Sequence, residues 1–205
     1  MDTKNIDGMN SVERCLKRTG DLVGAFLLLI LFSPVFLVIY IVQKIENKGP
    51  VIFKQERIGK GGKPFKILKF RTMQIEAEQD GVPRLATEGD KRIDKSGLFL
   101  REHHLDELPQ LWNVLVGDMS FVGYRPERLY FITQIMEHNP DYALLFVSRP
   151  GVTSNATLHN GYTDTMEKML LRLDMDLDYL RRRSIGLDIK IIVETAFSII
   201  GGKKF

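Results

Sequence analysis

Two adjacent carboxylates, Asp106 and Glu107, stand in the segment REHHLDELPQLWNVLVGDMSFVGYRPE, which covers residues 101–127. An aspartate can attack phosphorus to form an acyl-phosphate, and Mg²⁺ binds proteins through one or two carboxylates. Adjacent residues of a helix point about 100° apart, because one turn holds 3.6 residues. We therefore expect separate roles for the two side chains, one as a nucleophile and the other as a metal ligand.

Arginines surround this pair in the sequence and suggest a phosphate-bearing substrate. They are Arg92, Arg101, Arg125 and Arg128. Arginine suits bidentate contact with phosphate, and a helix N-terminus also binds phosphate. Two carboxylates would repel a diphosphate unless a divalent cation lay between them, so we expect Mg²⁺ as the cofactor.

A simpler account of the pair needs no chemistry. The apolar residues with helical spacing are Leu105, Leu108, Leu111, Trp112 and Leu115. Because Pro109 is tolerated only in a first turn, the pattern predicts a helix that begins near Asp106. Asp106 would then be the N-cap and Glu107 a first-turn residue favoured by the helix dipole. The same helix terminus would keep Asp106 ionised.

An apolar segment, residues 22–42, lies upstream and contains no ionisable group except Tyr40. As a straight helix its 21 residues would rise roughly 31 Å, which is enough to span a hydrocarbon core. Ser33 and Pro34 interrupt it. Pro34 removes the helical partner of the Ile30 carbonyl, and the Ser33 hydroxyl can reach back to the Leu29 carbonyl.

The Ser-Pro pair leaves two membrane arrangements open. One is a re-entrant helical hairpin, and the other is a single kinked span. Positive residues flank the segment on both sides: Arg14, Lys17 and Arg18 before it, and Lys44, Lys48 and Lys54 after it. This distribution favours cytoplasmic placement of both ends, and hence the hairpin.

A basic block follows the apolar segment directly. Residues 44–71 contain nine Lys or Arg and two Glu, a local charge of +7 in a chain of net charge +3. Such a block suits an anionic membrane face or a phosphate-rich substrate, and a solvated loop is the plainer alternative. We count Lys69 and Arg71, at its end, among the expected substrate-binding residues.

Short strands and helices are expected beyond the apolar segment. VIFKQERIGKGGKPFKILKFRTM reads as two strands around a glycine-rich turn, which lacks the spacing of a phosphate-binding loop. Residues 74–92 are expected to form a loop with a helical piece, and residues 128–147 and 165–183 to be helical. Residues 185–200 have an apolar face for a membrane surface or the core. Cys15 is the only cysteine, so no internal disulfide can form.

Several separated segments resemble the bacterial sugar transferases, the monotopic phosphoglycosyl transferases. LDELPQLWNVLVGDMSFVG is the most specific of them, and PVIFKQERIG, GKPFKILKFRTM and RPGVT support it in the correct order. A late pattern adds Asp176, Tyr179, Ser184, Asp188 and Ile191. The resemblance covers nearly everything from Thr19 onward and is to the small form of the family, which has no extra membrane spans.

The resemblance implies transfer of a sugar 1-phosphate from a UDP-sugar to polyprenyl (undecaprenyl) phosphate, with release of UMP. It implies a ping-pong mechanism in which Asp106 carries the phosphosugar and Glu107 binds Mg²⁺. It also implies that Ser33 and Pro34 bend a re-entrant helix. Lys69, Arg101, Arg125, Asp176 and Asp188 resemble the family's active-site basic and acidic residues.

The expected fold is therefore α+β. Residues 1–43 would form an N-terminal amphipathic segment and a re-entrant membrane helix-break-helix hairpin. Residues 44–205 would form a mostly helical catalytic domain with a small β-hairpin and interfacial amphipathic helices. We expect a monotopic protein on the cytoplasmic face of the bacterial inner membrane. Its partners would be a UDP-sugar, polyprenyl phosphate and anionic lipids. We expect no nucleic acid, and a homodimer stays open.

The chain departs from the family pattern in three places, and at one of them Glu102-His103-His104 replaces a more typical short polar run. The usual Gly-Pro-Arg-Pro is replaced by residues 123–126, in which Tyr124 would alter the local backbone or nucleotide contacts. Residues 154–164, SNATLHNGYTD, differ from the commoner Gly-x-Ala-Gln pattern, which leaves the identity of the sugar open.

Three other functions fit the same residues. A Mg²⁺-dependent phosphohydrolase of lipid diphosphates would use the same anchor and carboxylates. Direct attack by the lipid phosphate in a ternary complex would need no covalent intermediate. A membrane-tethered adaptor would use only the basic block, residues 44–71.

Overall fold

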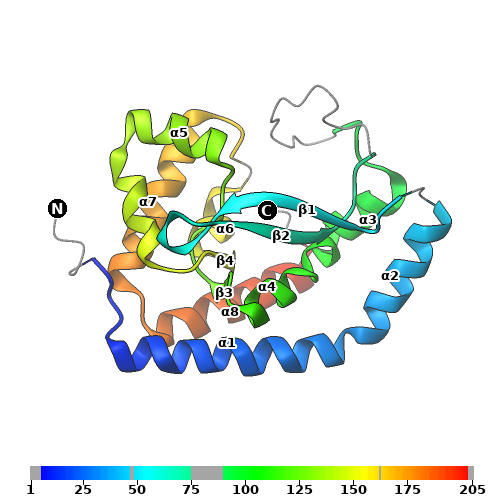
Figure 1. The fold of residues 1–205 in the computed structure, drawn as a ribbon, viewed down its shortest axis with the longest axis horizontal. Coiled ribbons are helices and arrows are strands. Elements are labelled where there is room, and N and C mark those ends of the chain that lie inside the picture. The colour runs from blue at the N-terminus through cyan, green and yellow to red at the C-terminus, as the bar shows by residue number, and fades with distance from the viewer. Residues whose placement is uncertain (1–5, 47–48, 75–89, 162, 203–205) are drawn as a thin grey trace.

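The computed structural model describes residues 6–46, 49–74, 90–161 and 163–202, and it combines helices with two small sheets (Figure 1). The helices are α1 (Ser11–Leu31), α2 (Ser33–Glu46), α3 (Lys95–Glu102), α4 (Gln110–Val116), α5 (Leu129–His138), α6 (Asn155–Asn160), α7 (Met166–Arg182) and α8 (Ile185–Ile200). The strands are β1 (Ile52–Ile58), β2 (Pro64–Phe70), β3 (Ser120–Val122) and β4 (Gly151–Thr153). Short 3₁₀ turns are η2 (Lys60–Gly62), η3 (Leu105–Glu107) and η4 (Pro140–Val147). The mixed fold class is confirmed.

The N-terminal part is a bent pair of helices. Of the helices in the described ranges, none alone combines the length and apolar character needed to cross a bilayer. The pair α1 and α2 together meets that criterion, with a bend of 58° between them. The Ser33 hydroxyl donates to the Ile30 carbonyl at 2.8 Å, one residue beyond the expected Leu29. This is the carbonyl that Pro34 leaves without its helical donor, so the Ser-Pro pair both makes the bend and compensates for it.

The β-hairpin is confirmed. β1 and β2 pair antiparallel from Ile52 opposite Phe70 to Ile58 opposite Pro64. Gly61 and Gly62 in the turn have φ of 71° and 70°, a region that glycine adopts without strain. The glycines therefore close the hairpin.

A second sheet was not predicted. β3 and β4 pair in parallel, with Ser120 opposite Gly151 and Val122 opposite Thr153. Each strand has three residues, too few for an alternating pattern to be recognised, and the connection between them contains α5 and η4. The backbones approach closely at this sheet, since a Cβ on Gly123 would lie 2.4 Å from the Arg149 carbonyl oxygen.

The later helices match the sequence analysis in part. α7 and α8 coincide with the predicted helices. The predicted helix over residues 128–147 is wrong as a single element. It is divided at Asn139 because the following proline disfavours helical backbone there. Of the loop expected at 74–92, residues 75–89 lie outside the described ranges. α2 continues to Glu46, so the predicted boundary at residue 43 falls inside a helix.

Apolar side chains are divided between a buried core and an exposed face. The largest cluster joins α5, η4 and α7 around residues such as Tyr124, Ile132, Leu145 and Leu173. In contrast, α8 exposes most of its apolar residues, including Ile189, Val193, Phe197 and Ile200, and buries Ile191. The sequence left open whether the apolar face of α8 packs into the domain core or lies on a membrane surface. Only a narrow stripe of this face packs into the core.

Tyr124 tests the packing of this core. Its side chain is buried, and its hydroxyl has no hydrogen-bond partner within the described residues. Tyr124→Phe removes an unpaired buried hydroxyl, and we expect the free energy of unfolding to stay the same or rise by about 1 kcal/mol. Tyr179→Phe is the matched control, because the Tyr179 hydroxyl donates to Asp188. Chemical denaturation of both variants should show loss of stability only for Tyr179→Phe, and equal losses would contradict this assignment.

Candidate active site

Asp106 and Glu107 lie in the 3₁₀ turn η3, and α4 begins only at Gln110. The prediction that Asp106 is a helix N-cap is wrong. His104 precedes the turn in the left-handed conformation with φ of 54°. Pro109 has no N–H for the Leu105 carbonyl, which instead accepts from Leu108 at 3.3 Å in a tighter turn.

Glu107 has a lysine as its counter-ion. Lys69 Nζ, near the end of β2, lies 2.6 Å from Glu107 Oε1. Burial alone would raise the pKa of Glu107, but the charges of Lys69 and Arg125 and the hydrogen bond from Lys69 lower it to about 2. Glu107 is therefore held as a carboxylate by a residue 38 positions away in the sequence.

Asp106 has the opposite environment. Its side chain is buried, and burial together with the charge of Glu107 raises its pKa, while Lys69 and Arg101 oppose the rise. The expectation that a helix terminus keeps Asp106 ionised is wrong, because only a three-residue 3₁₀ turn begins there and the α-helix starts at Gln110. The pKa values of the two neighbouring acids are thus shifted in opposite directions, as different roles for them would require.

Arg101 and Arg71 connect this pair to the surrounding elements. Arg101, in the last turn of α3, donates from Nε to Thr72 Oγ1 at 2.8 Å, and its charge acts on Asp106. Arg71 is buried, and its carbonyl accepts from Gln43 Nε2 of α2 at 2.6 Å. The end of the bent helix pair is therefore hydrogen-bonded to the segment that follows β2, beside Lys69.

Three expected substrate-binding residues, Arg92, Asp188 and Arg128, have other places in the fold. Arg92 forms an ion pair with Asp90 at 2.5 Å. Asp188 accepts from Tyr179 and pairs with Lys17 of α1. Arg128 occupies the position before α5. These contacts involve other residues than the carboxylate pair, and the roles of all three in substrate binding remain predictions.

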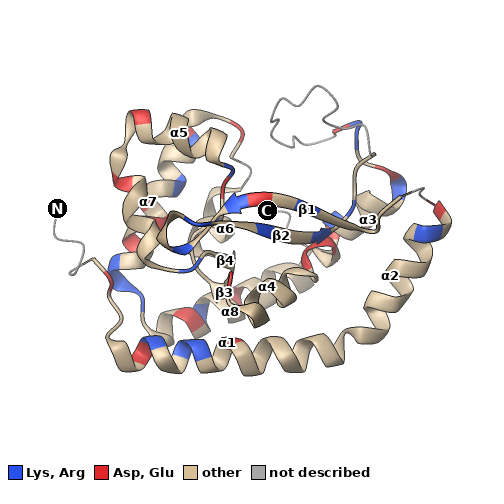
Figure 2. Ribbon diagram, viewed as in Figure 1, with Lys and Arg blue, Asp and Glu red and all other residues tan. Residues whose placement is uncertain are grey.

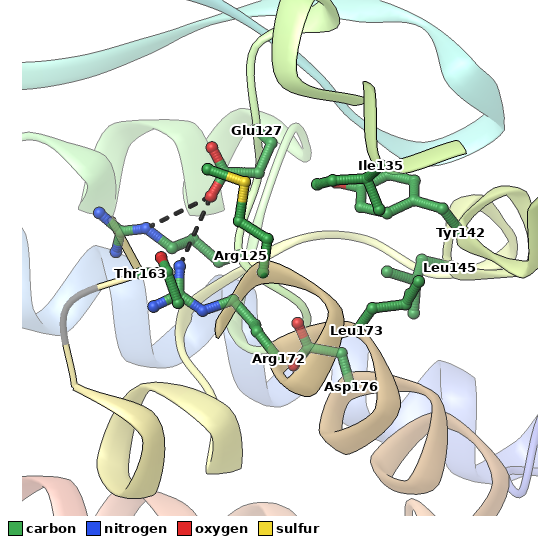
Figure 3. Close-up of a pocket in the computed structure, with 10 residues that line it drawn as sticks. Arg125, Glu127, Ile135, Tyr142, Leu145, Thr163, Arg172, Leu173 and Asp176 are labelled. Atoms are coloured by element: carbon green, nitrogen blue, oxygen red, sulfur yellow. Dashed lines mark ion pairs between the residues drawn. The ribbon is translucent and has the colours of Figure 1, made fainter. Parts of the chain in front are cut away.

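Arg125 and Asp176 line a small hollow together with Glu127 and Arg172 (Figure 3). Arg125 and Arg172 lie 3.9 and 3.5 Å from Glu127 Oε1. Burial raises the pKa of Asp176 to about 7, although Arg172 and the backbone N–H of Arg125 oppose the rise. The charge of Arg125 also lowers the pKa of Glu107.

Sequence reasoning missed Glu127, Arg172 and Arg57 in this network. Glu127 follows the Arg-Pro pair directly, and an acid beside an arginine expected to bind phosphate was a usable signal. Arg172 gave none, because it lies on a helix with many other charged residues. Arg57 also gave no signal, because it is one of nine Lys or Arg residues in the basic block, residues 44–71.

Asp106 and Glu107 could bind a Mg²⁺ ion that is also coordinated by the phosphates of a substrate. Within the described ranges, no three His, Cys, Asp or Glu side chains gather as a metal cage. Mg²⁺ does not need such a cage, because it commonly takes one or two carboxylates and completes its shell with water and substrate phosphates. The oxygen donors of Asp106 and Glu107 fit this mode.

Comparison with known proteins gives a consistent family match. A family model described as bacterial sugar transferase matches residues 12–202. The chain is 45% identical over 191 residues to UDP-glucose:undecaprenyl-phosphate glucose-1-phosphate transferase of Escherichia coli K12, covering 92% of this chain and 41% of that protein. It is 41% identical to a protein of the same name from Caulobacter vibrioides, covering 90% and 69%. It is 36% identical to exopolysaccharide production protein PSS of Rhizobium leguminosarum, covering 93% and 98%. The chain thus spans about two fifths of the Escherichia coli relative and nearly all of the Rhizobium one.

The ion pair between Lys69 and Glu107 can be tested through stability. Lys69→Met leaves the Glu107 carboxylate without its counter-ion, and we expect a loss of about 1–3 kcal/mol of unfolding free energy. Adding Glu107→Gln should restore part of this loss, because the uncompensated charge is removed. Lys66→Met, which removes an exposed lysine of the same strand, is the control. Additive losses in the double variant would mean that the two side chains do not stabilise each other.

Proposed function

The chain belongs to the bacterial sugar transferase family, and from this premise we propose that it transfers a sugar 1-phosphate from a UDP-sugar to polyprenyl phosphate and releases UMP. The names of its relatives in Escherichia coli and Caulobacter specify UDP-glucose and undecaprenyl phosphate. The observation that carries the proposal is the pair of unlike acids. Buried Asp106 lies beside Glu107, which Lys69 holds as a carboxylate.

We propose that Asp106 is the nucleophile. Its carboxylate oxygen would attack the phosphorus next to the sugar, and the bond from that phosphorus to UMP would break, with UMP taking the electron pair. An oxygen of polyprenyl phosphate would then attack the same phosphorus and release the Asp106 carboxylate. Splitting the transfer in this way lets a water-soluble donor and a lipid acceptor use one site in turn.

The residues around Asp106 would manage charge in both steps. Glu107, with Asp106 beside it, would hold Mg²⁺, which when bound supplies positive charge to the diphosphate and favours the ionised form of Asp106. Lys69 and Arg101 oppose the effect of burial on the pKa of Asp106. Arg125, whose charge lowers the pKa of Glu107, would bind a substrate phosphate.

We propose that α1 and α2 form a re-entrant hairpin in the cytoplasmic face of the inner membrane. Both ends of the apolar segment contact the same domain. Arg18 donates to the Val114 carbonyl of α4 at 2.7 Å, and Gln43 donates to the Arg71 carbonyl. A straight span would place these ends about 30 Å apart on opposite sides of the bilayer.

The distribution of charge and apolar surface supports the same placement. Lys and Arg gather at the start of α1, whereas the rest of α1 and most of α2 carry almost no charge (Figure 2). The exposed apolar residues of these helices include Phe26, Ile30, Leu37 and Val38. The apolar face of α8 would rest on the membrane surface beside them, with the basic residues at headgroup level.

The covalent step predicts an isolable enzyme adduct. With Mg²⁺ and a UDP-sugar but no lipid, we expect about one UMP per enzyme and the mass of a phosphosugar on the peptide containing Asp106. Asp106→Asn should abolish both signals, while Asp174→Asn, at an exposed position of α7, should leave them unchanged. Chelation of Mg²⁺ by EDTA should also abolish them. A screen of several UDP-sugars in this assay identifies the donor.

Other outcomes of this assay would replace the proposal. UMP release that occurs only with undecaprenyl phosphate, without any adduct, would indicate direct attack by the lipid phosphate. Inorganic phosphate released from a lipid diphosphate without nucleotide would indicate a phosphohydrolase. Retention of function in the cell after Asp106→Ala and Glu107→Ala would indicate an adaptor.

The hairpin predicts that residues 15 and 46 lie on the same side of the membrane. Cys15 is exposed at the start of α1, and Glu46→Cys in a Cys15→Ser background places one thiol at the end of α2. A membrane-impermeant maleimide should label both thiols in inside-out vesicles and neither in right-side-out vesicles. Labelling of the two positions from opposite sides would show a single span.

A further inference from the structure

The loop that carries Arg125, residues 123–127, is held at every position. The Gly123 N–H donates to the Thr153 carbonyl at 3.1 Å, and the Tyr124 carbonyl accepts from Gly151 at 2.9 Å. Thus β4 holds the first half of the loop. The Glu127 carbonyl accepts from the Ile58 N–H at 3.1 Å, so the end of β1 holds the other half.

Glu127 is the centre of a cluster of three arginines. Arg57 Nη1 of β1 lies 3.2 Å from Glu127 Oε2 and 3.1 Å from the Pro126 carbonyl. Arg172 of α7 and Arg125 approach the other carboxylate oxygen (Figure 3). Arg57 and Arg172 are largely shielded from solvent, whereas the Arg125 side chain remains 37% exposed. Arg125 approaches Glu127 through Nε at 3.9 Å, so the Nη atoms on the outer edge of its guanidinium do not make this contact.

Asp176 of α7 lies against the same loop. It is 3% exposed, and the backbone N–H of Arg125 lies close enough to its carboxyl group to oppose the rise in its pKa. Its Oδ1 has no hydrogen-bond partner within the described residues. The hollow that it lines has room for about one water molecule, which is smaller than a phosphate or a sugar.

We infer that Asp176, Glu127 and Arg172 are positioning residues, which fix the backbone and the Nε edge of Arg125 so that its outer edge faces the phosphate carried at Asp106. They do not contact the substrate themselves. This replaces the role in substrate binding that the sequence suggested for Asp176, and it rests on the proposed function for the role of Arg125. Arg57 supports the arrangement as the second anchor of Glu127.

A double-mutant cycle with Arg125 tests this inference. In the full chain, Asp176→Ala and Glu127→Ala should each lower kcat/KM for the UDP-sugar by roughly tenfold or more, the effect of losing a buried hydrogen bond to a charged group. In an Arg125→Ala background, the same changes should cost less than about twofold, because they act through the missing guanidinium. Additive losses would overturn the inference, since they would mean that Asp176 or Glu127 acts on the substrate directly.

Conservative variants keep the test valid if the alanine variants do not fold. The amide oxygen of Asp176→Asn can still accept from Arg125, so its activity should stay within about threefold of the parent. Glu127→Gln removes the charge that three arginines share and should lose roughly fivefold or more, a loss that Arg125→Ala should again mask. Asp178→Asn, at an exposed site two residues from Asp176, is the matched control. A larger loss of activity in Asp176→Asn than in Glu127→Gln would contradict the inference.

A second measurement does not depend on turnover. Phenylglyoxal modification of Arg125, followed by peptide mass spectrometry in the absence of substrate, should be about threefold faster in Glu127→Ala or Glu127→Gln than in the parent or in Asp178→Asn. Unchanged modification would overturn the positioning role. If the parent protein releases no UMP from any UDP-sugar, the proposed function fails, and the modification rates still decide whether these residues hold Arg125.

Discussion

Two adjacent acids can share a shielded turn only if a cation compensates one of them, and Lys69 does this for Glu107. Without that ion pair the two negative charges would repel each other next to a buried surface. With it, the pKa of Glu107 is lowered and Glu107 stays a carboxylate, whereas burial raises the pKa of Asp106. The division of labour in the proposed reaction depends on this inequality, and the inequality depends on β2 placing Lys69 opposite η3.

The same strand connects the chemistry to the membrane helices. Lys69 lies near the end of β2, and the Arg71 carbonyl just beyond it accepts from Gln43 of α2. α1 is attached to the other side of the domain through Arg18 and the carbonyls at the end of α4. α4 follows directly after the turn that carries Asp106. Both arms of the bent pair are therefore attached to segments next to the turn that carries the acids, and in the proposed reaction a polyprenyl phosphate would present its headgroup there.

Much of this arrangement could be predicted from the sequence where a signal was local. The uncharged segment interrupted by Ser33 and Pro34 predicted two helices with a bend, and the glycines after β1 predicted the hairpin. The turn around Asp106 was misread as a helix start, because Pro109 is compatible with a first turn and also with the 3₁₀ turn that forms. Contacts between distant segments had no local signal. The pairing of β3 with β4, the contact of Asp188 with Lys17, and the arginines around Glu127 arise only when the chain folds.

The stereochemical course at the transferred phosphorus tests the central claim most directly. A UDP-sugar with sulfur in place of one non-bridging oxygen on the phosphorus next to the sugar is chiral there, and its configuration can be compared with that of the lipid product. Each in-line displacement inverts the configuration. Transfer through Asp106 therefore predicts overall retention, and inversion would show a single displacement by the lipid and contradict the account.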